Sequence, residues 1–179
     1  MSTIEQTEQT ALPTGTWQAD TVHSGVTFEV PYAVATFSGE VTDFDAAIAD
    51  GKLTGSARIS SLVIKDENLK GHLLSPEFFD AERFPVVGFS AGDVHIEGNE
   101  VTLEGELTLK GITKPATLTG TITGPAIDHF GANRVGLALQ TTIDRTEFDI
   151  NWNMPLPNGE PALANDVTLK ADLTLVEQA

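Results

Sequence analysis

The sequence VTLEGELTLKG, at residues 101–111, is the clearest strand pattern in the chain. Val101, Leu103, Leu107 and Leu109 alternate there with threonine and glutamate. Successive side chains of a β-strand point to opposite faces, so a period of two predicts a strand with one buried and one solvated face. The same alternation recurs at residues 26–30, 52–60, 117–123 and 167–175.

Groups of turn-forming residues recur about every 8 to 12 residues along the chain, a spacing typical of sandwiches and barrels. The turns are expected at Asp50-Gly51, Glu97-Gly98-Asn99, Thr123-Gly124-Pro125 and Pro157-Asn158-Gly159. Further strands are expected near residues 17–20, 36–45, 86–96 and 133–143. We therefore predict an all-β fold, an antiparallel β-barrel of about eight strands.

One segment, residues 65–84, breaks the alternation and predicts a short helical insertion. Ser75 is a candidate N-cap, and Pro76 suits the first position of a helix. Leu73, Phe78 and Phe79 are expected to cover or flank one mouth of the barrel.

The two ends of the chain differ in composition. Residues 1–14 are polar and without periodicity, which predicts a disordered tail before one domain at residues 15–179. The first ten residues hold no lysine, arginine or apolar run, so no secretory signal is recognised and we expect a cytoplasmic protein. No stretch approaches the apolar length of a transmembrane helix, so stable membrane insertion is not expected.

Charge and composition exclude several partners and chemistries. The formal net charge is -16, from 26 acidic and 10 basic residues. Such a surface repels phosphate groups, so neither nucleic acid nor an anionic bilayer is an expected partner. The chain has no cysteine, which excludes disulfides, thiolate metal sites and a cysteine nucleophile.

No catalytic or metal motif is present. The four histidines are scattered without the i, i+4 spacing of a helical metal site, so we expect no metal and no cofactor. Neither a Gly-x-Ser-x-Gly elbow nor a glycine-rich phosphate loop occurs, and we therefore expect no enzyme. Arg145 either pairs with Asp144 and Glu147 at a strand end or stacks on Trp17 or Trp152.

Glycine recurs within the strands on the apolar phase, at Gly55, Gly105 and Gly120. A glycine in a strand marks either a bend with close backbone packing or space for something other than protein. Both readings are open here, since an eight-stranded barrel either fills with side chains or holds one small ligand.

Several ordered motifs resemble the YceI-like family over residues 15–179. They are TWQADTVHSGVTF at 16–28, GHLLSPEFFD at 71–80, RFP at 83–85, GELTLKGITKP at 105–115, GANRVG at 131–136 and TIDRTEFDI at 142–150. The resemblance implies a lipocalin-like barrel with a polyisoprenoid or another long lipid in an apolar pore, and a possible homodimer. The family often has an aspartate two residues before the His-Leu pair, where this chain has Lys70-Gly71. It often has a histidine after the first long strand, where this chain has Pro31-Tyr32. The polar end of the pocket is therefore expected to differ from that of the family.

We therefore expect a non-catalytic carrier of an isoprenoid quinone, a polyprenyl lipid or a similar long-chain amphiphile. His72 lies in the insertion and either contacts the ligand or makes a local hydrogen bond. The expected ligand-binding residues are Phe28, Val30, Leu53, Ala57, Phe89, Leu103, Gly105, Leu107, Leu118 and Gly120, with His72, Leu73, Phe78 and Phe79 at the mouth.

Two alternatives remain. One is an enzyme acting on a bound isoprenoid or quinone with His72 as acid or base, which convergence of His72 and Arg145 on the pocket would favour. The other is a stress-related structural barrel without ligand, which an interior closed by bulky side chains would favour.

Overall fold

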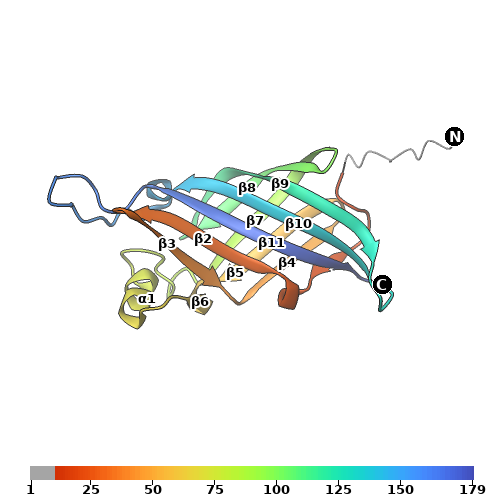
Figure 1. Cartoon of the computed structure of the whole chain (residues 1–179), viewed down its shortest axis with the longest axis horizontal. Coiled ribbons are helices and arrows are strands. Elements are labelled where there is room, and N and C mark those ends of the chain that lie inside the picture. Colours follow the sequence, from red (N-terminus) through yellow and green to blue (C-terminus); the bar gives the residue numbers. More distant parts are fainter. Residues whose placement is uncertain (1–10) are drawn as a thin grey trace.

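The computed structural model describes residues 11–179, and residues 1–10 of the predicted tail lie outside the described residues. The described chain forms a closed antiparallel β-barrel of eight strands, which confirms the predicted fold (Figure 1). The strand segments are β1 (Trp17–Ala19), β2 (Gly25–Tyr32), β3 (Ala35–Val41), β4 (Phe44–Ala49), β5 (Lys52–Arg58), β6 (Leu62–Val63), β7 (Val86–Glu97), β8 (Glu100–Leu109), β9 (Ile112–Ile127), β10 (Asn133–Asp144) and β11 (Asp166–Glu177).

Three of the eight strands are interrupted, which explains why the segments outnumber the strands. The 3-10 turn η1 (Thr21–His23) separates β1 from β2, and both segments pair with β11. A break at residues 42–43 separates β3 from β4, and η2 (Ile59–Ser61) separates β5 from β6. The barrel closes where β1 pairs with β4 on one side and with β11 on the other.

Three of the four predicted turns are present, at Asp50-Gly51, Glu97-Gly98-Asn99 and Pro157-Asn158-Gly159, and the one at Thr123-Gly124-Pro125 is wrong. Gly51 and Gly98 adopt positive φ angles of 74° and 63° in the β4–β5 and β7–β8 turns, as their glycines predicted. Gly124, however, lies inside β9, where the pairing register with β10 shifts. A bulge adds a residue without ending the strand. The chain therefore reverses only at residues 128–132.

The insertion contains a helix, α1 (Glu67–Leu74), but it begins earlier than predicted. Asp66 is the N-cap, and its carboxylate accepts hydrogen bonds from the backbone N–H groups of Asn68 and Leu69. Ser75 ends the helix instead of starting it, so the predicted start at Ser75-Pro76 is wrong. The reason is physical, because Asp66 satisfies the free N–H groups of the first turn and Pro76 cannot continue the helical hydrogen bonding.

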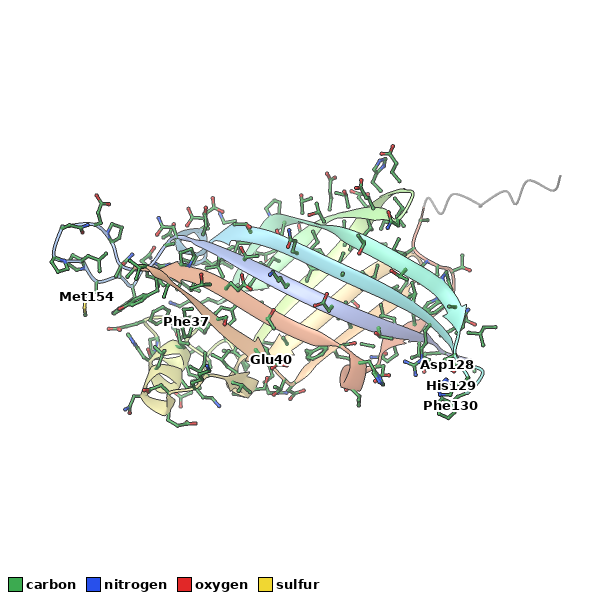
Figure 2. The ribbon with its side chains drawn as sticks, viewed as in Figure 1. Phe37, Glu40, Asp128, His129, Phe130 and Met154 are labelled. Atoms are coloured by element: carbon green, nitrogen blue, oxygen red, sulfur yellow. The ribbon has the colours of Figure 1, made fainter. Side chains whose placement is uncertain are left out.

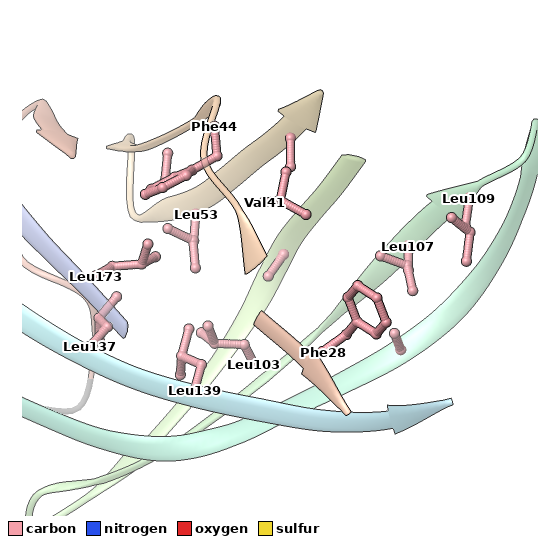
Figure 3. Close-up of a cluster of buried hydrophobic side chains, with 14 of the residues drawn as sticks. Phe28, Val41, Phe44, Leu53, Leu103, Leu107, Leu109, Leu137, Leu139 and Leu173 are labelled. Carbon is pink, nitrogen blue, oxygen red and sulfur yellow. The ribbon is translucent and has the colours of Figure 1, made fainter. Parts of the chain in front are cut away.

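The interior has two halves, and we call the one near the C-terminus the filled half. Its side chains meet across the barrel and leave almost no exposed surface. Figure 3 shows part of the buried interior, with Leu137 beside Leu173 on the neighbouring strand. The filled half consists of Leu12, Trp17, Ile48, Ile96, Val101, Leu103, Val135, Leu137 and Leu175.

Leu12 belongs to the core although it lies in the predicted tail. Its side chain is 3% exposed, and the carbonyl of Thr14 accepts a hydrogen bond from Trp17 Nε1 at 2.9 Å. An apolar side chain gains free energy by leaving water, and this position provides a buried site for it. Leu12 therefore packs on the barrel, so the folded domain includes at least this residue before Gly15.

An ion-pair network lies at the same end as the filled half. Arg134 of β10 donates to Asp20 at 2.9 Å and to Asp128 at 2.5 Å. These hydrogen bonds hold the pKa of Asp20 well below its usual range and lower the pKa of Asp128 to about 2. The network joins the end of β1 to the β9–β10 turn.

Candidate functional site

A cavity of about 440 Å³ occupies the other half of the barrel, which we call the hollow half. It lies at the end that carries α1, opposite the C-terminus (Figure 1). Its floor is made by apolar side chains next to the filled half, among them Phe44, Leu139 and Leu173. The predicted site residues that border it are Phe28, Val30, Leu53, Ala57, His72, Leu73, Phe78, Phe79, Phe89, Leu107 and Leu118.

Three predicted residues do not border the cavity. Leu103 is completely buried in the filled half. A Cβ atom on Gly105 would overlap the carbonyl oxygen of Ser90, and one on Gly120 would overlap that of Ala138. Both glycines therefore serve close backbone packing, and the prediction that they open space for a ligand is corrected.

Gly55, by contrast, is a strand glycine that borders the cavity, as is Gly88 of β7. A Cβ atom added to Gly55 would lie 3.6 Å from the carbonyl oxygen of Asp45 and 4.0 Å from the Cβ of Ala46. These are ordinary contact distances, so the space beyond Gly55 is open. Gly55, Ala46 and Ala57 are thus small residues on one side of the cavity wall.

The sequence prediction missed wall residues on regular strands, such as Leu139 and Leu173, and also those that come from irregular segments. Ile150, Trp152 and Leu163 belong to the long connection between β10 and β11, which has no alternation. Phe37 and Phe44 lie on either side of the break between β3 and β4. The break interrupts the alternation, so the inward-facing positions of β4 cannot be extrapolated from those of β3. The aromatic rings themselves were the available signal, but their phase could not be read across a break.

An aromatic cluster lies at the mouth of the cavity. The ring of His72 is 4.9 Å from the ring of Phe78 and 4.9 Å from that of Trp152, in edge-to-face geometry. This arrangement is favourable for aromatic rings and joins the insertion to the β10–β11 connection. His72 Nε2 also lies 2.5 Å from the carboxylate of Glu77. The local hydrogen bond is thus present, and contact between His72 and a ligand stays a prediction.

Arg145 is buried at the cavity wall and holds the β10–β11 connection in place. It begins the 3-10 turn η3 (Arg145–Phe148) and is 3% exposed. Burial lowers the pKa of its guanidinium, although the nearby Asp144 acts in the opposite direction. Its donors reach backbone carbonyl oxygens of Ile150 (2.8 Å), Trp152 (2.8 Å), Leu163 (3.3 Å) and Ala164 (2.8 Å).

The predictions for Arg145 are therefore wrong. Within residues 11–179 it forms neither an ion pair with Asp144 or Glu147 nor a cation–π contact with a tryptophan. Asp144 instead accepts a hydrogen bond from the backbone N–H of Thr146 at 2.9 Å. Buried carbonyl groups need donors, and Arg145 supplies several in one side chain.

Lys110 connects three segments at the same mouth. Its ammonium group is buried and donates to the carbonyl oxygens of Pro76 at 2.9 Å and Asp149 at 2.8 Å. Next to it, Gly111 lies against the ring of Phe84. The β8–β9 turn thereby anchors both the insertion and the β10–β11 connection over the cavity.

Two further features bear on possible sites. Residues 11–179 contain no group of three or more histidine or acidic side chains that could hold a metal ion. In the same part of the chain, no helix has the length and apolar character needed to cross a membrane.

Comparison with known proteins agrees with this architecture. The YceI-like domain model matches residues 17–175. A UPF0312 protein of Vibrio parahaemolyticus is 30% identical over 155 residues, which cover 78% of this chain and 82% of that protein.

Solved structures show the same fold. BcnA of Burkholderia cenocepacia superposes with a TM-score of 0.71 at 18% identity, over 87% of this chain and 98% of that one. A domain from Saccharophagus degradans, described as polyisoprenoid binding, superposes with a TM-score of 0.69 at 10% identity, over 90% and 98%. The extent of the domain match shows that this chain belongs to the YceI-like family.

Proposed function

We propose that this protein binds a polyisoprenoid, such as an isoprenoid quinone or a polyprenyl lipid, or a similar long-chain amphiphile, without transforming it. The observation that carries the proposal is the apolar cavity of the hollow half. Its volume of about 440 Å³ falls in the range of roughly 300–1,000 Å³ usual for ligand pockets.

The lining favours a hydrocarbon chain over a polar ligand. Side chains from Leu173 at the floor to Leu107 and Phe28 further along are apolar. The polar groups of His72 and Arg145 lie toward the mouth and already have protein partners. A chain in the cavity with its head group outside would satisfy both regions.

The test is ligand identification followed by blocking of the cavity. Native mass spectrometry of the purified protein, with lipid extraction, should show a copurified long-chain amphiphile. Gly55→Phe should keep the barrel folded and lower binding of a fluorescent polyprenyl probe at least about tenfold, because the ring would enter the open space. Gly25→Phe is the matched control, since Gly25 is also a strand glycine with open space around it but lies outside the cavity lining. Parental binding by folded Gly55→Phe would contradict the proposal.

One observation favours a second candidate, an enzyme that acts on the bound isoprenoid or quinone. His72 and Arg145 both border the cavity and both contact Trp152. Binding stands first because the donors of Arg145 are engaged with backbone carbonyls. Incubation with a polyprenyl quinone, followed by mass analysis of the recovered ligand, separates the two. A carrier returns it unchanged, whereas an enzyme gives a product that His72→Ala abolishes.

A further inference from the structure

The connection between β10 and β11 forms an ordered projection at the cavity mouth, which we call the mouth finger (residues 152–163). Figure 1 shows this connection extending beyond the end of the barrel. Within the finger, the N–H of Leu156 donates to the carbonyl of Glu160 at 2.7 Å, and Pro155 bridges to Pro161. The finger is thus a short hairpin.

The mouth finger is joined to the tip of the β2–β3 hairpin (residues 31–35). The N–H of Ala33 donates to the carbonyl of Ala162 at 2.8 Å, and the N–H of Ala164 donates to that of Pro31 at 2.9 Å. Tyr32 also pairs with Leu163. Two segments that are far apart in the sequence therefore form one small sheet at the rim of the cavity.

This rim exposes apolar side chains and almost no charge. Val34 is fully exposed and Met154 is 56% exposed. Figure 2 shows Met154 out on the finger. Residues 30–36 contain no charged side chain and residues 150–163 contain only Glu160, in a chain with a net charge of -16. Contiguous apolar surface without charge marks an interaction site.

The apolar surface of the rim continues into the cavity. Tyr32 and Leu163 of the small sheet and Trp152 at the base of the mouth finger also line the cavity. Exposed apolar residues occur at the opposite end too, at Ile127 and Phe130, but these flank Asp128 of the ion-pair network and lead to the filled half. The rim at the mouth connects an exposed apolar surface with the cavity, as does Leu69 of α1, which is 36% exposed and lines the same cavity.

We propose that the mouth finger and the β2–β3 tip dock transiently on the electrically neutral surface of a zwitterionic phospholipid bilayer, and that the cavity exchanges its amphiphile there. Val34 and Met154 enter the interface, and Tyr32 lies at the level of the head groups, where amphipathic rings are favoured. The acidic remainder of the surface is repelled by anionic lipids, so a neutral bilayer is the better partner. Exchange rests on the proposed function, whereas docking needs no ligand.

Flotation of the delipidated full chain with phosphatidylcholine vesicles tests the docking. The double variant Val34→Asp/Met154→Asp should lose at least about tenfold in vesicle binding, because burial of one such side chain is worth about a factor of ten or more. The matched control Ile127→Asp/Phe130→Asp adds the same charge at the opposite end and should bind like the parent. Vesicles containing phosphatidylglycerol should bind the parent less strongly than pure phosphatidylcholine.

The docking proposal is wrong if the parent does not float with the vesicles, if both double variants lose binding equally, or if binding requires phosphatidylglycerol. It is also wrong if the parent is a dimer that Val34→Asp/Met154→Asp dissociates, because the rim would then be an interface with a second copy of the chain. Binding of a polyprenyl probe added from detergent is measured separately. Its absence in the parent would contradict the proposed function and leave the flotation result standing, so the two failures are distinguishable.

Discussion

The filled and hollow halves are built from the same strands, yet they differ in what occupies the barrel axis. On β8, Leu103 lies in the filled half and Leu107 borders the cavity, and both side chains point to the barrel interior. In the filled half, the large side chains of Trp17 and Ile48, on the paired strands β1 and β4, are buried in the interior. In the hollow half, Gly55 has no side chain and leaves space. Inward-facing apolar residues therefore do not by themselves decide whether a barrel is solid, because the size of the residues opposite them also matters.

The largest expected effect comes from enlarging a glycine of the filled half. Gly120→Leu should destabilise the fold by more than about 4 kcal/mol or prevent folding, because the Cβ would overlap the carbonyl oxygen of Ala138. Urea denaturation followed by circular dichroism measures this. Gly55→Leu in the hollow half should remain folded. If both variants are equally stable, close backbone packing does not distinguish the halves.

Truncation of one leucine in each half sharpens the comparison. Leu103→Ala should cost about 4 kcal/mol, since a fully packed side chain leaves a new void. Leu107→Ala, tested on delipidated protein, should cost about 2 kcal/mol, because its side chain already borders a cavity. Chemical denaturation of the two variants provides the test, and a larger loss for Leu107→Ala would reverse our assignment of the halves.

Removal of the bound amphiphile should affect the two halves unequally. At a ligand concentration of about 100 times the Kd, binding contributes about 2.7 kcal/mol, which delipidation removes. Amide hydrogen exchange should then rise in β2 and around α1 while staying slow in β1 and at the end of β11. A uniform rise along the chain would show that the cavity does not open independently of the filled half.

The smallest expected effect is on acid stability and concerns the end of the filled half. Arg134 lowers the pKa of Asp20 and of Asp128, so both carboxylates stabilise the fold above the ordinary aspartate pKa of about 3.9. That contribution is lost as the pH falls from about 4 through 2. In thermal melts across this range, Arg134→Met should show a weaker pH dependence of Tm than the parent. An unchanged dependence would mean that other carboxylates control acid unfolding.

Much of the fold follows from local patterns. The alternation around Leu103 and Leu107 predicts both strands and their inward faces, and Asp50-Gly51 predicts a hairpin turn that the structure contains. The position of α1 was predicted only within its segment, because Asp66 and Ser75 are both acceptable N-caps and the contacts of the insertion select between them. Arg145 could not be assigned, since its carbonyl partners lie in a connection without periodicity.

The sequence alone determined which residues of each strand face inward, because the period of two is a property of neighbouring residues. Only the tertiary structure decided which inward glycine borders a cavity. Gly55, Gly105 and Gly120 occupy the same kind of local pattern. What distinguishes them is the backbone that approaches from an adjacent strand, and that distance depends on how the whole barrel coils and closes.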